Sequence, residues 1–232
     1  MGPGAGFSGI PRKPRNSTGS LVMWLRRRGL RELGSLTLSL LFMSCVTTAA
    51  PSTVAISYTP DNAVQLVKDA GAVTLAVNDL RANQGKVGNT TGMISKAGNG
   101  VITSTESVTV IVKTAMESEL RNRGFTFSGG IASVKIDVTQ FDVAHLVIWH
   151  KNQLFHRLSY NAEAKVLMHV GVTGAGGKHV YSRLIFGLND SDKDSDQQTL
   201  DLALQTALRD LFGDPNFIAA ILAAEQGPPN QR

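Results

Sequence analysis

Residues 158–172 read Leu-Ser-Tyr-Asn-Ala-Glu-Ala-Lys-Val-Leu-Met-His-Val-Gly-Val. Apolar or small side chains occupy the even positions, and most of the odd positions are polar. Because successive side chains of a β-strand point to opposite faces, this alternation predicts a long strand with one buried and one solvated face. Such a strand is typical of an antiparallel sheet that is covered on one side.

The residues before this strand alternate as well. Val134, Ile136 and Val138 are separated by polar residues, and the alternation resumes one position out of register at Phe141 and Val143. An extra residue in one strand of a pair shifts the register in this way. We therefore expect a second long strand that contains a β-bulge.

Further strands are predicted on both sides of this pair. Residues 173–178, Thr-Gly-Ala-Gly-Gly-Lys, form a turn, and residues 180–188 alternate again as a returning strand. The β-rich runs 53–58 and 72–77 predict two short strands near the start of the domain.

A glycine-rich segment, residues 81–103, separates these short strands from the rest of the domain. Its composition predicts a long solvated loop, and a binding loop is the alternative. A short hairpin within it would pass through Met93, Ile94, Val101 and Ile102.

Two regions carry apolar residues at the spacing of a helix. In residues 104–123 they recur every three or four positions; Ser104 or Thr105 is the expected cap, and Gly124 is expected to end the helix. Residues 200–211 predict a second helix, capped by Asp194, Ser195 or Asp196. A short third helix follows Pro215 and is capped by Asp214.

Strands and segregated helices together predict an α+β fold: a two-layer sandwich of a mainly antiparallel sheet with helices packed on one face. We expect a single domain over residues 53–225, a common size for one hydrophobic core, and a disordered tail over residues 226–232.

The N-terminal region has the order of a bacterial lipoprotein signal peptide. Arginines precede a short apolar run that ends in Leu41-Phe42-Met43-Ser44, followed by Cys45, which is the only cysteine. The apolar run is too short to cross a bilayer, which takes about 20 residues. We predict that residues 1–44 are a signal peptide with a basic n-region, with Met23 as an alternative start. Leu41 to Ser44 are its recognition residues, Cys45 is acylated, for example with palmitate, and residues 45–52 form a tether.

The net charge of +5 belongs to this leader. Seven of the 23 basic residues and one of the 18 acidic residues precede Cys45, so the chain from Cys45 onward carries a net charge of −1. A nucleic-acid-binding domain requires clustered basic residues, and we therefore predict no nucleic-acid partner.

The motifs of enzymes and metal sites are incomplete. Residues 171–178 lack the glycine spacing of a phosphate loop, and Asp190, Asp192 and Asp194 begin a calcium-like pattern that lacks its glycine and its glutamate. The histidines show no zinc spacing, and there is no nucleophile elbow. We predict no enzymatic activity, no cofactor and no metal.

One apolar segment favours a contact with a partner. Trp149, Leu154 and Phe155 surround a polar turn between the two long strands. Large apolar groups at a hairpin tip are typical of a protein-binding or lipid-facing patch, although burial in the core is the alternative.

Thr103 to Phe127, the pentapeptide Val134-Lys135-Ile136-Asp137-Val138 and the closing stretch Ala203 to Ile221 resemble the YajG family of uncharacterised bacterial envelope lipoproteins. The resemblance covers roughly residues 45 to 222 and lies in the order of the features. It implies an outer-membrane lipoprotein that faces the periplasm. It also implies that Val46, where aspartate would favour the inner membrane, permits transfer to the outer membrane.

Two functions follow as hypotheses. The first is a membrane-anchored interaction module that presents a sheet edge or a hairpin to an envelope protein. The alternative is an accessory carrier of lipid or another apolar ligand, similar to auxiliary lipoproteins of transport systems, which would need an apolar cavity. The sequence makes no prediction of the oligomeric state.

Overall fold

The computed structural model describes residues 51–60, 64–90, 100–151 and 156–226. The chain separates into two units, Met1–Val46 and Thr47–Arg232, and all described residues belong to the second. The predicted signal peptide and the start of the tether therefore lie outside the described residues, as do residues 227–232 of the predicted tail.

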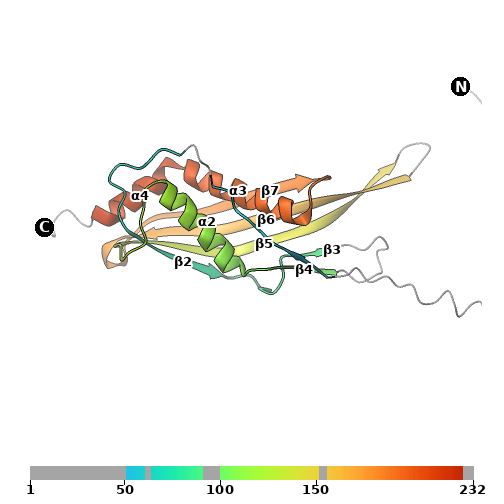
Figure 1. The fold of residues 1–232 in the computed structure, drawn as a ribbon, viewed down its shortest axis with the longest axis horizontal. Coiled ribbons are helices and arrows are strands. Elements are labelled where there is room, and N and C mark those ends of the chain that lie inside the picture. The colour runs from blue at the N-terminus through green and yellow to red at the C-terminus, as the bar shows by residue number, and fades with distance from the viewer. Residues whose placement is uncertain (1–50, 61–63, 91–99, 152–155, 227–232) are drawn as a thin grey trace, which may run out of the picture. The chain divides into compact units, whose positions relative to one another are not determined.

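The described unit contains seven strands, three α-helices and a short 3₁₀ turn (Figure 1). The strands are β1 Ser52–Val54, β2 Val73–Asp79, β3 Gly88–Thr90, β4 Gly100–Ser104, β5 Ala132–Lys151, β6 His156–Thr173 and β7 His179–Ser191. The helices are α2 Val108–Asn122, α3 Asp196–Gly213 and α4 Pro215–Gln226, and the 3₁₀ turn is Ala175–Gly177.

All seven strands belong to one mixed sheet built around β5. Its central order is β1-β4-β3-β5-β6-β7, and β2 pairs with another part of β5. The long pairs β5–β6 and β6–β7 are antiparallel, as short connections require, whereas β2 and β3 run parallel to β5. A parallel pair needs a crossover, and the chain between β2 and β5 includes α2. The predicted α+β fold is confirmed.

The predicted bulge in β5 is also confirmed. The register with β6 shifts between Val138 and Gln140. Val138 is buried before the shift, and Phe141 and Val143 are buried after it, so the bulge keeps apolar side chains on the same face of the sheet. The even positions of β6 from Ala162 to Val172 are buried on that face.

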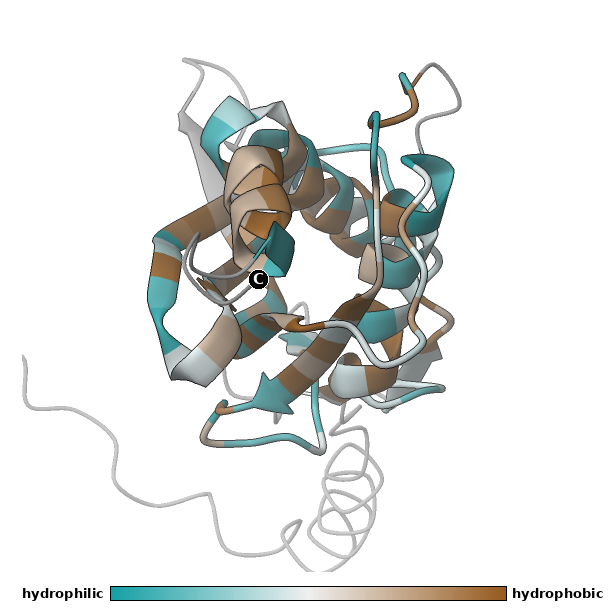
Figure 2. Ribbon diagram, turned by 90° about the vertical axis from the view of Figure 1, so that its left-hand side faces the viewer, coloured by the Kyte–Doolittle hydropathy of each residue, from teal (hydrophilic) through white to brown (hydrophobic). Residues whose placement is uncertain are grey.

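The helices α2, α3 and α4 all cover this face (Figure 1). Their buried stripes pack on the sheet through Val112, Met116 and Leu120 of α2, Leu200, Leu204 and Leu208 of α3, and Phe217 and Ile221 of α4. In a ribbon coloured by hydropathy, apolar and polar bands alternate along the strands, as expected for a sheet with one covered face (Figure 2).

The ends of α2 follow from local chemistry. The hydroxyl of Ser107 accepts a hydrogen bond from the Val110 N–H, so the helix begins later than predicted and neither Ser104 nor Thr105 caps it. Gly124 adopts φ +96° and ends the helix as predicted. The N–H groups of Gly124 and Phe125 bind the carbonyls of Arg121 and Leu120, which is a Schellman motif.

The caps of α3 and α4 match the sequence prediction. Ser195 and Gln198 form a reciprocal capping box at the start of α3. The carboxylate of Asp214 accepts a hydrogen bond from the Asn216 N–H at 2.9 Å, and Pro215 opens α4. The helix α4 continues through Gln226, one residue beyond the domain boundary predicted at 225.

Two predictions for the N-terminal half are wrong in part. The strand predicted over 53–58 is shorter, because only Ser52–Val54 pairs with β4, and Ser57 instead binds the carboxylate of Asp201 on α3. Segment 81–103 is not all loop, because β3 pairs with β4, with Gly88 opposite Ile102. Met93 and Ile94 lie outside the described residues.

Candidate functional site

Most of the predicted site residues lie outside the described part of the chain. These are Leu41, Phe42, Met43, Ser44 and Cys45, as well as Leu154 and Phe155. Trp149 lies within β5, but its side chain is outside the described part. Among the described helices, none has both the length and the apolar composition needed to cross a membrane.

The face of the sheet opposite the helices carries a row of exposed apolar side chains on β7. Leu184, Phe186 and Leu188 are 59%, 47% and 42% exposed, whereas Ile185 between them is fully buried under the helices. No described helix covers this row. Phe186 stands opposite Leu167 of β6, so the apolar surface continues onto the neighbouring strand.

The same strand forms an edge of the sheet. β7 pairs with β6 on one side, and no described strand pairs with its other side along its thirteen residues. Backbone N–H and C=O groups on an unpaired edge are free to bind another extended chain. We call the outer edge of β7, together with Leu184, Phe186 and Leu188, the β7 surface.

Polar groups near the start of β7 are satisfied within the chain. Arg183 donates hydrogen bonds to Asp210 and Asp214 at 3.1 Å each, and the Tyr181 hydroxyl donates to Asp214 at 3.0 Å. Burial, together with the neighbouring Asp214 carboxylate, raises the pKa of Tyr181 to about 12. The Asn216 N–H, with Tyr181 and Arg183, lowers the pKa of Asp214. Tyr181 and Arg183 therefore face α3, on the side of the strand opposite Leu184, Phe186 and Leu188.

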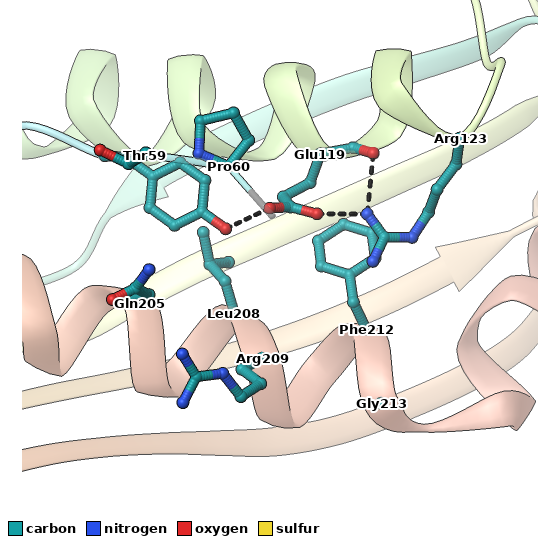
Figure 3. Close-up of a pocket in the computed structure, with 10 residues that line it drawn as sticks. Thr59, Pro60, Glu119, Arg123, Gln205, Leu208, Arg209, Phe212 and Gly213 are labelled. Atoms are coloured by element: carbon teal, nitrogen blue, oxygen red, sulfur yellow. Dashed lines mark hydrogen bonds and ion pairs between the residues drawn. The ribbon is translucent and has the colours of Figure 1, made fainter. Parts of the chain in front are cut away.

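A hollow of about 610 Å³ lies between α2, α3 and residues 58–60 (Figure 3). At its wall, the buried carboxylate of Glu119 accepts hydrogen bonds from the Tyr58 hydroxyl and the Arg123 guanidinium. Arg123 also lies over the Phe212 ring. Glu119 and Arg123 extend from α2, and Phe212 extends from α3 toward Arg123 (Figure 3).

This arrangement holds the N-terminal segment and two helices together. A buried carboxylate needs paired donors, and Tyr58 and Arg123 supply them from two separate segments. Gln205 and Arg209 line the hollow from α3. Within the described residues, no group of three or more His, Cys, Asp or Glu side chains could hold a metal ion.

A second buried ion pair joins the end of β2 to the first residue of the segment 81–103, which was predicted as a loop. Arg81 binds both carboxylate oxygens of Asp79 at 2.8 and 2.9 Å, and it donates to the carbonyls of Gln84, Lys86 and Phe141. Burial alone would raise the pKa of Asp79, but the bonds from Arg81 outweigh it and lower that pKa. Arg81 therefore ties the end of β2 to the bulged part of β5.

Neither the two ion pairs nor the β7 surface was predicted from the sequence. The spacing of Glu119 indicates that it is buried, since it falls three residues after Met116 and four after Ala115 on the buried stripe of α2. Nothing in the sequence indicates that Arg81 is buried, because a single arginine among glycines and polar residues is normally solvated.

No family model and no curated protein matches the sequence. Nine chains of solved structures are similar to this chain. The crystal structure of a protein from Xanthomonas campestris, assigned to family DUF330, shares 14% identity with a TM-score of 0.45, over 77% of this chain and 97% of that chain. The crystal structure of an uncharacterised protein shares 12% identity with a TM-score of 0.39, over 76% of this chain and 98% of that chain. Their names assign no activity to either protein.

Proposed function

We propose that the protein is a lipid-anchored interaction module of the bacterial cell envelope, attached through Cys45 to the periplasmic face of the outer membrane. The order of arginines, apolar run, small Ser44 and Cys45 supports the anchor. The resemblance to the YajG family supports the location. Acylation gives stable attachment, because each buried methylene contributes about 0.8 kcal/mol and two chains suffice.

The β7 surface is the observation that carries the interaction function. Three large apolar side chains stand in a row on an uncovered sheet face, beside an unpaired strand edge. Proteins normally shield such edges with charges, proline or bulges, and contiguous exposed apolar groups mark contact sites. The domain would act by binding an envelope protein at this surface.

The alternative, a carrier of lipid or another apolar ligand, needs an apolar cavity. The hollow between α2 and α3 has Glu119, Arg123 and Arg209 in its walls. Placing an acyl chain against charged groups is unfavourable, because they would lose contact with water. The side chains at the sheet–helix interface are buried and form one apolar cluster. The geometry therefore favours the interaction module.

The anchor is tested by Cys45→Ser in the full chain expressed in bacteria. The variant should lose acylation, migrate as the unprocessed precursor and be absent from the outer-membrane fraction, because its uncleaved apolar segment would keep it at the inner membrane. Ser44→Ala is the matched control, because it keeps a small residue before the cysteine and should fractionate like the natural chain. Unchanged fractionation and mobility of Cys45→Ser would refute the anchor.

The interaction is tested by a photoreactive side chain placed at Leu184 in intact cells. It should give adducts with protein, identified by mass spectrometry, because Leu184 is exposed on the β7 surface. The control position is Lys113, half-exposed on α2 and away from β7. Equal labelling at both positions, or none at Leu184, would show that the β7 surface is not an interface.

A further inference from the structure

The centre of the β7 edge lacks the features that usually block strand pairing. Between Leu184 and Asn189 the sequence is Leu-Ile-Phe-Gly-Leu-Asn, with no charge and no proline. The register irregularity of the β6–β7 pair lies near the start of β7, opposite Val172 and Thr173, and not in this stretch. An edge of this kind can accept another strand along its backbone.

One flank of α3 lies beside β7. Asp210 of α3 is turned toward β7, where it binds Arg183. Thr206 lies one helical turn earlier on the same flank, and its hydroxyl is held by the Leu202 carbonyl at 2.8 Å. This flank of α3 therefore carries, one turn apart, Asp210, the small uncharged Thr206 and Leu202, which is 40% exposed.

We propose that the β7 surface binds a second copy of this chain, with the two β7 strands antiparallel and joined into one continuous sheet across a two-fold axis at Phe186. This inference names the partner of the surface described under the proposed function and rests on that function. In a two-fold contact both copies use the same surface. Every contact between two different residues therefore occurs twice, once in each direction.

The side chains of β7 select this position of the axis. With Phe186 opposite Phe186 of the second copy, Leu184 falls opposite Leu188 in both halves, and every large apolar group of the row meets another. Cross-strand pairs of this kind stabilise antiparallel sheets. Moving the axis to Leu188 would place Phe186 opposite Asp190, and moving it to Leu184 would place Phe186 opposite Ser182.

The remaining positions are compatible with this register. On the covered face, Ile185 falls opposite Gly187 of the second copy, so no two bulky groups compete for space. Ser182 falls opposite Asp190 and can donate a hydrogen bond to it. Arg183 falls opposite Asn189 and keeps its own partners, Asp210 and Asp214. A shared membrane would also raise the local concentration of the two copies.

Association is tested by co-expressing two full-length copies with different affinity tags and purifying one of them in detergent. The natural chains should co-purify, and the complex should have the protein mass of two copies. Phe186→Lys should reduce the mass to one copy, because two ammonium groups would meet at the axis. Val110→Lys is the matched control: Val110 is 46% exposed, close to Phe186, but lies on α2.

Phe186→Lys tests the surface only if the variant folds. Its circular dichroism and its thermal unfolding, measured at low concentration, should match those of Val110→Lys. Leu184→Lys provides a second variant on the same row and should also give the mass of one copy.

The register is tested by Phe186→Cys in full-length chains under mild oxidation. This thiol should form a disulfide with the same position of the second copy. Ser182→Cys should not, because Asp190 lies opposite it and the two thiols are eight residues apart along the paired strands. The natural chain, with Cys45 alone, is the baseline.

Each result decides the question. A single-copy mass for the natural chains, or a dimer unaffected by Phe186→Lys, overturns the inference. A disulfide at Ser182→Cys instead of Phe186→Cys overturns the register and the two-fold axis at Phe186. If the photoreactive group at Leu184 captures only another envelope protein, the second copy is excluded while the proposed interaction function stands.

Discussion

The guanidinium carbon of Arg123 lies 4.1 Å from the centre of the Phe212 ring. Arg123 caps the end of α2, and Phe212 belongs to the last turn of α3, so this cation–π contact joins the two helices at one end of the domain. The same guanidinium binds Glu119. The charge of Arg123 is therefore balanced by a carboxylate on its own helix and by a ring on the neighbouring helix.

Glu119→Ala should lower the free energy of unfolding by about 3–5 kcal/mol, because it leaves Arg123 charged and largely buried without its carboxylate. The two side chains are 3% and 11% exposed. The measurement is equilibrium unfolding in denaturant. On the same helix, Glu117→Ala serves as the control: it breaks contacts with exposed Arg121 and Lys113 and should cost at most about 1 kcal/mol. Equal losses would contradict the assigned role of Glu119.

Arg81→Lys should lower the free energy of unfolding by about 2 kcal/mol or more, although it keeps the charge. A lysine cannot reproduce the two-pronged contact with Asp79 and also reach three carbonyls, and each buried group left unsatisfied costs about 1–3 kcal/mol. Lys135→Arg is the matched exchange at an exposed ion pair with Asp137 and should be nearly neutral. Denaturant unfolding of both variants would show the difference. An unchanged free energy of unfolding for Arg81→Lys would show that the contacts of Arg81 do not stabilise the domain.

The long strands were predictable because their signal is local. Eight alternating positions in residues 158–172 specify β6 without reference to any other segment, and the one-residue slip before Phe141 specifies the bulge in β5. The pairing of β1, β2 and β3 was not predictable. The partners of β1 in β4 and of β2 and β3 in β5, such as Ile102 for Ser52, are 50 or more residues away, and runs of three to seven residues do not select a distant partner.

The β7 surface could not be predicted from the sequence for a different reason. Both faces of β7 carry apolar residues: Ile185 on one, and Leu184 and Phe186 on the other. Period-two alternation therefore predicts the strand but does not say which set is buried. Only the packing of α3 decides this, and it selects the face of Gly187, where a helix can approach closely.

Gly187→Ala should destabilise the domain by about 1–3 kcal/mol or more, as expected for overpacking. A Cβ at this position would lie 2.0 Å from the Ala203 carbonyl oxygen and 2.8 Å from the Ala207 Cβ, so α3 would have to move away from β7. Gly171→Ala in β6 is the matched control, since its nearest neighbour would be 3.8 Å away. It should be neutral or slightly stabilising. Thermal unfolding compares the two variants, and similar midpoints would contradict the close helix–strand contact.

Tyr181 should ionise near pH 12, whereas an unperturbed tyrosine ionises near pH 10. Because the folded pKa is raised, the stability that the protonated hydroxyl contributes is present below about pH 10 and is lost as the pH rises from there toward 12. Phenolate absorbance of the natural chain minus that of Tyr181→Phe isolates this group among the three tyrosines. Asp214→Asn should lower its pKa, because the carboxylate that accepts its proton becomes neutral. A difference titration centred near pH 10 in the natural chain would show that Tyr181 is not buried against Asp214.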